Sequence, residues 1–355
     1  MKIIHCADLH IDCKTKFSAE KRNIIRNQLL QSFVDMVDFA EKNKVAAILL
    51  CGDIFEDRKP LKRSLKVLQD CISSHKNIQF FHVWGNHDEN IKIFDKSQSN
   101  YICFGTTFSK VDFGDISIGG VSFRRQYGEE FYDSIDFDKN DFNIFMMHTP
   151  VETGKYSEPL ILKKVSSKYI DYLAMGHIHD RCEGSFGKRG TWAFSGCMNS
   201  TSFSDLGVQG FELLDISNGK LTKQFVPFSK YDFNVIEVDI SNLSSINEVE
   251  IAVENVLKNY GENDILRIVF VGKKTEDLVV DCASIEQLFK NKVFYLEVFN
   301  KSRLIFDLKK YAAEKLSLKA EFVNTVFNDD TLTEEQKQQI CSVGIEVLKG
   351  EEVHL

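Results

Sequence analysis

The chain has 355 residues, of which 43% are hydrophobic, and this is enough apolar material for two domains with separate cores. Its formal net charge is −8, because residues 1–228 carry 29 basic and 29 acidic side chains whereas residues 229–355 carry 15 and 23. These totals argue against a stand-alone nucleic-acid-binding protein with a strongly basic surface. No apolar run approaches the roughly 20 residues of a membrane span, so we expect a soluble, cytoplasmic protein without a signal peptide.

Nine cysteines are scattered along the chain without a CxxC pair or a regular spacing. An odd, irregular set favours reduced thiols over a disulfide framework or a zinc ribbon. We therefore expect several of the cysteines to act as small buried apolar residues.

The first predicted elements alternate between strand and helix. A short apolar run indicates a buried strand, and apolar positions that recur every three or four residues indicate a helix. By these patterns the elements are a strand at 2–8, a helix at 19–43, a strand at 45–51, a helix at 61–74 and a strand at 78–84. This succession is typical of a largely parallel sheet.

Shorter strands follow in the next part of the chain. They are predicted at 116–122, 142–148, 172–175, 191–195, 210–216 and 221–226. Several polar motifs come just after the carboxyl ends of predicted strands. That edge is where ligands bind in open α/β sheets, so we expect the functional site there.

The pattern restarts after Pro227, which places a domain boundary near residue 228. Residues 229–303 then predict a small αβ domain of about three strands and two helices. Its strands are expected at 233–240, 265–271 and 293–299, and its helices at 246–260 and 284–291.

The last part of the chain, 304–355, is predicted as a helical tail. Thr333 to Gln336 form a capping box, which indicates the start of a final helix that runs through Leu348. Apolar positions between Leu304 and Phe322 fit either core packing or partner docking.

Five short motifs contain residues that bind metals. They are Asp8-Leu9-His10, Gly52-Asp53, Gly85-Asn86-His87-Asp88, His148 and Gly176-His177-Ile178-His179. One such motif alone is weak evidence, because these residue pairs occur by chance in most chains of this length. Five in order, each at a predicted strand end, indicate a binuclear metal site that hydrolyses phosphate esters.

The residue types divide between two metal positions. Asp53 is the natural bridge between the ions, because it follows a glycine at a strand end and a carboxylate can bind two cations. We assign Asp8, His10 and His179 to the first metal position and Asn86, His148 and His177 to the second metal position. His177 and His179, two residues apart on an extended segment, point to the same side and can reach both ions.

His87 is expected to do chemistry rather than to bind metal. Adjacent residues on an extended turn point in different directions, so His87 can face the scissile phosphate if Asn86 faces the metal. There it can protonate the leaving oxygen or stabilise the transition state, with Asp88 holding its other nitrogen. The remaining histidines, His5, His75, His82 and His354, are interpreted as ordinary core or surface residues.

The motifs, in this order, resemble those of the calcineurin-like metallophosphoesterase superfamily, and every ligand position of that pattern is filled. The superfamily resemblance spans about residues 1–228, and within the superfamily the chain most resembles bacterial SbcD-like DNA repair exonucleases, including the YhaO-like group. The segments that carry this likeness are Ala7 to His10, Gly52 to Pro60, Gly196 to Ser200 and Gly207 to Phe211.

The resemblance implies a four-layer αββα sandwich that binds Mn²⁺ at both metal positions and cleaves phosphodiesters in DNA. His, Asp and Asn ligands also admit Fe²⁺ or Zn²⁺. The resemblance further implies that 229–303 form a capping domain that helps to seat DNA. The tail at 304–355 would then dock onto a coiled-coil ATPase of the SbcC type. Assembly as a homodimer also stays open.

The acidic second half would not grip DNA by itself. We therefore expect either a partner or the loops of residues 1–228 to supply positive charge, with Arg58, Arg124 and Arg125 as candidate substrate-binding residues. Each of these side chains taken singly is more simply an exposed surface charge.

Two alternative functions stay open. A phosphomonoesterase or a cyclic-nucleotide phosphodiesterase would use the same site, although the small αβ domain argues for a polymeric substrate. A non-catalytic scaffold would have lost ligands, whereas no ligand is missing here.

Overall fold

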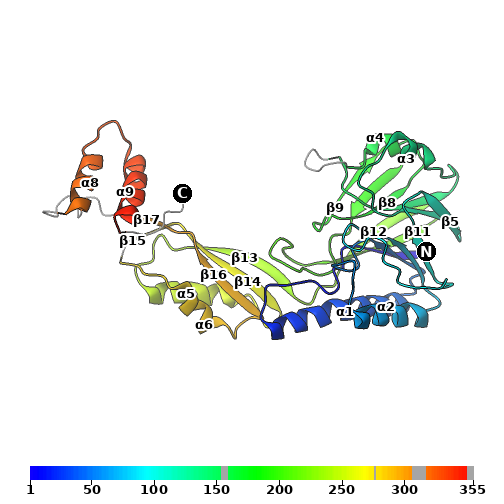
Figure 1. The fold of residues 1–355 in the computed structure, drawn as a ribbon, viewed down its shortest axis with the longest axis horizontal. Coiled ribbons are helices and arrows are strands. Elements are labelled where there is room, and N and C mark those ends of the chain that lie inside the picture. Colours follow the sequence, from blue (N-terminus) through cyan, green and yellow to red (C-terminus); the bar gives the residue numbers. More distant parts are fainter. Residues whose placement is uncertain (153–158, 276, 306–316, 350–355) are drawn as a thin grey trace. The chain divides into compact units, whose positions relative to one another are not determined.

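The computed structural model describes residues 1–152, 159–275, 277–305 and 317–349. The chain is a mixed α/β protein that divides into two compact units, Met1–Phe233 and Asn234–Leu355 (Figure 1). Within the described ranges, every helix is too short or too polar to cross a membrane.

The first unit contains two six-stranded sheets, and the first of them has the strand order β12-β11-β1-β2-β3-β4. Its centre is parallel, because β1 pairs with β2, β2 with β3 and β3 with β4 in the same direction, whereas β11 and β12 are antiparallel. The bounds are β1 Lys2–Cys6, β2 Ala47–Cys51, β3 Gln79–Val83, β4 Tyr101–Phe104, β11 Gly210–Ser217 and β12 Lys220–Pro227.

The second sheet has the order β5-β6-β7-β8-β10-β9. Its centre is also parallel, from β6 through β7 and β8 to β10, with antiparallel strands at both edges. The bounds are β5 Ser109–Phe113, β6 Ile116–Val121, β7 Phe142–His148, β8 Tyr172–Gly176, β9 Cys182–Phe186 and β10 Gly190–Phe194.

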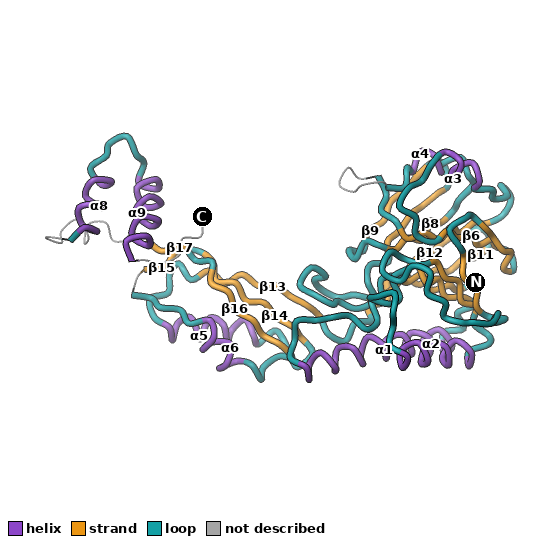
Figure 2. Tube along the Cα trace, in the orientation of Figure 1, coloured by secondary structure: helices purple, strands orange, loops and turns teal. Residues whose placement is uncertain are grey.

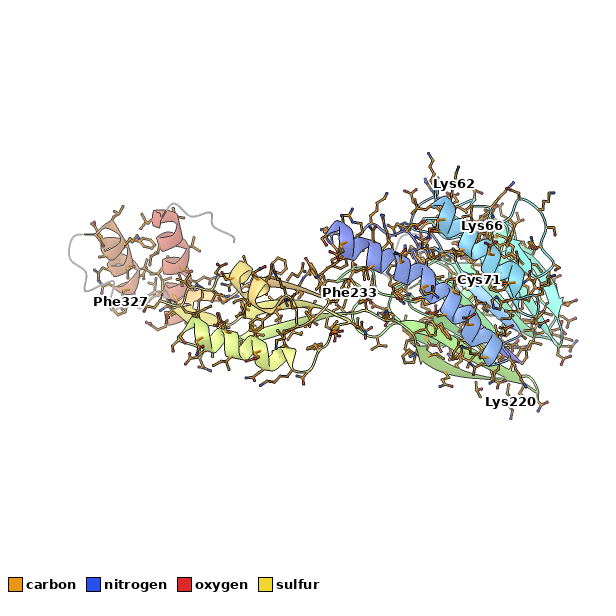
Figure 3. All side chains as sticks on the ribbon, turned by 90° about the horizontal axis from the view of Figure 1, so that it is seen from below. Lys62, Lys66, Cys71, Lys220, Phe233 and Phe327 are labelled. Atoms are coloured by element: carbon orange, nitrogen blue, oxygen red, sulfur yellow. The ribbon has the colours of Figure 1, made fainter. Side chains whose placement is uncertain are left out.

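Helices cover the outer faces of both sheets. Alternate residues of β2 show the layering, since Ile48 and Leu50 pack in the cluster with helix residues such as Phe33 and Met36, whereas Leu49 packs between the sheets. Figure 3 shows α1 (Ala19–Lys42) and α2 (Lys62–Ser74) side by side on the first sheet. The short helices α3 (Glu129–Ser134) and α4 (Leu162–Val165) contribute to the cluster on the outer face of the second sheet. The result is the four-layer αββα arrangement expected from the resemblance.

The second unit contains a three-stranded sheet with the order β13-β14-β16. Two helices pack on one face of it and share its apolar core, in which Val253 and Ile285 meet Ile268. Figure 2 shows these helices beside the strands. The bounds are β13 Asp232–Asp239, α5 Ile246–Leu257, β14 Asp264–Val271, α6 Cys282–Phe289 and β16 Tyr295–Asn300.

The chain continues with a short parallel pair, β15 (Lys273–Thr275) and β17 (Arg303–Ile305), and then with α8 (Leu318–Phe327) and α9 (Glu334–Lys349). The predicted capping box is confirmed, because the Thr333 N–H donates to Oε1 of Gln336 at 2.8 Å and the Gln336 N–H to Oγ1 of Thr333 at 3.3 Å. The two helices enclose a small apolar cluster of their own. The predicted tail residues 306–316 and 350–355, and with them His354, lie outside the described residues.

Candidate metal centre

All the candidate ligands lie at the carboxyl ends of parallel strands. Three of these strands, β1, β2 and β3, are neighbours in the first sheet, and two, β7 and β8, are neighbours in the second sheet. Loops after β1, β2 and β3 carry Asp8, His10, Asp53 and Asn86, while His148 ends β7 and His177 and His179 follow β8. The site therefore forms where the same edges of the two sheets meet.

The backbone at the site is strained. Four of the candidate ligands have a positive φ, which non-glycine residues rarely adopt: Asp8 (52°), His10 (44°), Asp53 (51°) and His177 (94°). Such conformations cost of order 1–3 kcal/mol each and persist where the surroundings enforce them. Their concentration at the ends of strands from both sheets supports a functional role for this edge.

Two glycines allow the ligand loops to approach one another. A Cβ atom on Gly52 would lie 2.3 Å from Nδ1 of His148, and Gly52 also has a φ of +88°. A Cβ atom on Gly176 would lie 2.0 Å from the main-chain oxygen of Cys51. Side chains at either position would therefore force the two sheets apart at the site.

The residues assigned to the first metal position are close together. Nε2 of His10 lies 3.1 Å from Nε2 of His179, and Nε2 of His179 lies 3.9 Å from Oδ1 of Asp8. Oδ2 of Asp53 is 4.0 Å from Nε2 of His10. These donor atoms surround a volume of the size that one cation occupies.

The residues assigned to the second metal position also converge. Oδ1 of Asn86 lies 3.2 Å from Nε2 of His148 and 3.0 Å from Nδ1 of His177. Oδ2 of Asp53 is 3.3 Å from Nε2 of His148. Asp53 thus reaches both groups, and the structure brings together all seven residues that the sequence singled out.

Three of the four imidazoles are held by their remote nitrogen. Nδ1 of His10 contacts Oε2 of Glu56, Nδ1 of His148 contacts the main-chain oxygen of Cys51, and Nδ1 of His179 contacts Oδ1 of Asp205, each at 2.8 Å. A carbonyl or carboxylate oxygen can only accept, so Nδ1 carries the proton in each ring. Nε2 is then the free donor for a metal, and its orientation is fixed from behind.

Glu56 and Asp205 hold two candidate ligands, and the sequence analysis missed both of them. Glu56 follows Asp53 by three residues, and its place in the Gly-Asp loop was a usable signal. Asp205 is 26 residues from His179, and no pattern in the sequence connects the two.

The electrostatics of the site favour a bound cation. Nε2 of His10 and Nε2 of His179 lie 3.1 Å apart, so two neutral rings protonated at Nδ1 would turn their lone pairs toward each other, and a cation between them would remove that repulsion. Burial opposes charge on His148, but the Asp53 and Asp8 carboxylates raise the pKa of its ring to about 9. On His148, a proton thus takes the place that a cation would fill. The donor groups suit one divalent ion at each position.

Asp53 is suited to remain ionised. Burial alone would raise the pKa of its carboxyl, but His148, His10 and the His87 N–H hold that pKa well below its ordinary value. Asp205 behaves similarly, because its hydrogen bond with His179 outweighs burial and lowers its pKa to about 2. Both carboxylates are therefore anionic at neutral pH.

His87 lies at the exposed rim of the site, with its ring centroid 5.0 Å from that of His10. Its main-chain N–H donates to Oδ1 of Asp53 at 2.8 Å, and its Nδ1 contacts the main-chain oxygen of Glu56 at 3.0 Å. Nδ1 is consequently the protonated nitrogen. Nε2 is left to face a substrate.

The expectation that Asp88 holds His87 is wrong. Asp88 is fully buried, and its carboxylate accepts the main-chain N–H groups of Gly85 and Ile54, both at 2.7 Å. The turn directs its side chain inward, where unpaired amides of two ligand loops need an acceptor. Asp88 therefore links these loops. The main-chain oxygen of Glu56, rather than Asp88, contacts Nδ1 of His87.

The candidate substrate-binding arginines differ in their contacts. Arg58 is exposed and paired with Glu89. Arg124 lies 5.9 Å from the ring centroid of Phe131, and Arg125 is exposed. Arg124 and Arg125 follow Phe123, whose ring centroid is 6.4 Å from that of His148. This places the start of their loop beside the second metal position.

Each of the histidines interpreted as ordinary residues contacts an oxygen atom of the protein where the structure describes it. Nδ1 of His5 contacts the Tyr172 hydroxyl at 2.8 Å, and burial lowers the pKa of His5 to about 3. His82 contacts the Tyr101 hydroxyl at 2.7 Å, and its pKa is likewise lowered to about 3 by burial. Nδ1 of His75 contacts the Cys71 oxygen at 2.7 Å.

Comparison with known proteins agrees with this geometry. The family model described as calcineurin-like phosphoesterase matches residues 1–181, a range that includes every candidate metal ligand from Asp8 to His179.

Three curated relatives extend the similarity beyond that range. The SbcD component of the nuclease SbcCD of Staphylococcus epidermidis is 26% identical over 288 residues, covering 68% of this chain and 74% of that protein. The uncharacterized metallophosphoesterase YhaO of Bacillus subtilis is 24% identical over 310 residues, covering 79% of this chain and 74% of that protein. The DNA double-strand break repair protein Mre11 of Methanosarcina acetivorans is 23% identical over 257 residues, covering 67% of this chain and 41% of that protein.

Proposed function

The chain belongs to the calcineurin-like phosphoesterase family, and from this premise we propose that it is a manganese-dependent DNA nuclease that acts in DNA repair. As a metallophosphoesterase it is a hydrolase, and it is related at about 25% identity to proteins named as a nuclease component and as a double-strand break repair protein. The step from phosphoesterase to DNA nuclease is the proposed part.

The observation that carries the proposal is the convergence of a complete donor set with His87 beside it. Donor atoms of seven residues lie in two groups joined by Asp53, and His87 is held at the rim by Asp53 and Glu56. A site that had lost its activity would not need to preserve both features. The alternative of a non-catalytic scaffold therefore has no support in this geometry.

When bound, two divalent ions would neutralise the phosphodiester and activate a water molecule for attack. The protein supplies the remaining functions. Asp53 spans both positions, and the imidazoles held through Nδ1 present their Nε2 atoms in fixed directions. His87 donates its Nδ1–H to the main-chain oxygen of Glu56; when the ring carries a second proton, on Nε2, it can pass that proton to the leaving oxygen, a role worth roughly 10²- to 10⁴-fold in rate.

A polymeric substrate is supported by the second unit and by the relatives. The three-stranded sheet with α5 and α6 is a separate small domain that a small-molecule diesterase would not need. We propose that it caps the catalytic domain and helps to seat DNA, as an αβ capping domain. Because residues 229–355 are acidic, with 15 basic and 23 acidic side chains, the proposed DNA path runs mainly over loops of the first unit.

The helical pair α8 and α9 is proposed as the docking site for a coiled-coil ATPase of the SbcC type. The pair keeps apolar residues exposed: Leu318 is 68% exposed and Val347 is 58% exposed. An open pocket of about 440 Å³ lies between the helices and is lined in part by Phe322, Ile340 and Val343. Such an apolar surface suits one face of an amphipathic helix.

A reducing compartment, and so the cytoplasm, is the proposed location. All nine cysteines lie in the described ranges and all are free thiols. Most of them, including Cys6 and Cys51, are buried, and burial raises the pKa of Cys6 and Cys51. Unreactive, unpaired thiols are typical of proteins kept in a reducing environment.

One assay tests the nuclease proposal. Purified protein with Mn²⁺ is incubated with end-labelled duplex DNA, single-stranded DNA and a phosphomonoester, with His87→Ala as the blank. We expect shortened DNA from the wild-type protein and none from the variant. Hydrolysis of the monoester alone would refute the nuclease and favour a phosphomonoesterase.

A further inference from the structure

The two metal positions differ in the groups that contact the remote nitrogens of their imidazoles. At the first metal position, both rings are backed by carboxylates, because Glu56 accepts from Nδ1 of His10 and Asp205 accepts from Nδ1 of His179, each at 2.8 Å. Asp8 adds a further carboxylate that faces the position directly. The first metal position thus has two backing carboxylates, Glu56 and Asp205, besides Asp8 and Asp53, which also lie close to the second metal position.

The second metal position has neutral groups in the corresponding places. His148 is backed by the main-chain oxygen of Cys51, and Asn86 contributes an uncharged amide oxygen. For Nε2 of His177, the described part of the chain provides no hydrogen-bond acceptor. The carboxylates close to this position are Asp53 and Asp8, and both are shared with the first metal position.

The Asp205 carboxylate is fixed by further hydrogen bonds, and the backbone that carries Glu56 is held on both sides. Asp205 is buried, and its Oδ2 accepts from the N–H of Thr201 at 3.2 Å and from the Thr201 hydroxyl at 3.1 Å. The main chain of Glu56 is held in both directions, because its N–H donates to Ile11 at 3.0 Å and its oxygen accepts from His87 at 3.0 Å. Neither carboxylate needs to move to hold its imidazole.

We propose that Glu56 and Asp205 are positioning residues that make the first metal position the tighter of the two. An anion behind an imidazole fixes the tautomer and raises the basicity of the coordinating nitrogen. The added negative charge also attracts a divalent cation. The second ion, whose imidazoles have no backing carboxylate among the described residues, binds more weakly and exchanges with the medium, so the concentration of free ion controls the fraction of protein that holds both ions.

The inference rests on the proposed two-metal site, and titration of the metal-free full-length protein with Mn²⁺ tests it. Isothermal calorimetry of the wild type is expected to show two binding events that differ at least tenfold in affinity, on the scale of about 10- to 100-fold that such backing groups contribute. Anomalous diffraction after one equivalent of Mn²⁺ is expected to place the ion among Asp8, His10 and His179.

The variants Glu56→Gln and Asp205→Asn keep an oxygen acceptor and remove the charge. Each is expected to weaken the tighter event about tenfold and to leave the weaker event within about twofold, given that such backing groups are worth roughly 10- to 100-fold in metal affinity. Asp57→Asn is the matched control, because it makes the same charge change one residue away on an exposed side chain that pairs with Lys14. It is expected to leave both events unchanged.

The outcomes distinguish a failure of this inference from a failure of the proposed two-metal site. Two events of equal affinity, a first ion found at Asn86, His148 and His177, or variants that weaken both events equally would overturn the inference alone. A wild-type protein that binds fewer than two ions would overturn the two-metal site itself. Circular dichroism of each variant shows that a lost event does not reflect unfolding.

Discussion

Oδ1 of Asp53 accepts a hydrogen bond from the main-chain N–H of His87 at 2.8 Å. The same carboxylate directs its other oxygen, Oδ2, toward the metal positions, 3.3 Å from Nε2 of His148. The proposed bridging ligand therefore fixes the backbone of the proposed proton donor. Because this contact uses the main chain, the side chain at residue 87 can be changed without disturbing Asp53.

Replacing His87 by alanine is expected to remove turnover and to spare the metals. The rate should fall roughly 10²- to 10⁴-fold, because the leaving oxygen loses its proton donor. Metal content by mass spectrometry and cleavage of end-labelled duplex DNA are the two measurements. His75→Ala, at a histidine held by Cys71 on α2, is the control and should leave both unchanged. A fully active His87→Ala protein, or one without metal, would contradict the assigned role.

Asp88→Asn is expected to lower stability rather than to alter the chemistry of His87. The new amide would place a donor against one of the N–H groups of Gly85 and Ile54, at a cost of roughly 1–3 kcal/mol. Urea unfolding of the metal-free protein measures this loss. The pH–rate profile of the remaining activity should keep its shape, because His87 rests on the Glu56 carbonyl. A shifted profile at unchanged stability would restore Asp88 as the partner of His87.

Metal binding is expected to release about one proton near neutral pH. His148 has a pKa of about 9 without metal, so its ring is mostly protonated there and must lose that proton to bind a cation. The affinity for Mn²⁺ should accordingly rise with pH, up to about tenfold per unit, and level off above the pKa of His148. Calorimetry in buffers of different ionisation enthalpy counts the proton. No release near neutral pH would mean that His148 is already neutral.

Arg125→Gln is expected to weaken DNA binding through the loss of one phosphate contact. The slope of log affinity against log salt should become shallower by about 0.7 to 0.9. Fluorescence anisotropy with labelled DNA at several salt concentrations measures it, with Lys220→Gln as a control at the start of β12, where Lys220 is exposed (Figure 3). If the two variants reduce the slope equally, Arg125 is an ordinary surface charge.

Ile340→Asp is expected to disrupt docking of the ATPase partner without affecting hydrolysis. Ile340 is 39% exposed and lines the pocket between α8 and α9, so a carboxylate there would be buried on docking. Pull-down with an SbcC-type coiled coil measures binding, and DNA cleavage by the isolated variant measures activity. Ile251→Asp, on α5 and 49% exposed, is the matched control. Binding that survives Ile340→Asp but not Ile251→Asp would move the docking surface to α5.

Strong apolar patterns predicted the main elements correctly. The helix expected at 19–43 is α1 (Ala19–Lys42), and the strand expected at 45–51 is β2 (Ala47–Cys51). α1 is buried along one face and β2 along its whole length, so many residues contribute to each apolar pattern. The strands β4 (Tyr101–Phe104) and β9 (Cys182–Phe186) were missed because they are short and mostly only partly buried or exposed. Such strands depend on their neighbours more than on their own residues.

The residues of the candidate site likewise divide into those that the sequence predicted and those that it did not. Its ligands were identifiable because each follows a strand end in a recognisable order. Asp205 was not, because only the folded chain brings it 2.8 Å from His179. Asp88 was misplaced because proximity in sequence suggested a contact with His87, whereas unpaired amides of the neighbouring loop compete more strongly for a buried carboxylate.

The ligands come from the ends of strands in two different sheets, and this has a consequence for the lifetime of the protein in the cell. Bound ions would join β1, β2 and β3 to β7 and β8 at one edge, so they stabilise the folded chain increasingly as their free concentration rises. At about a hundred times the dissociation constant this amounts to about 2.7 kcal/mol. Metal starvation would then open that edge to cellular proteases, and the supply of the ion would set the abundance of the enzyme as well as its activity.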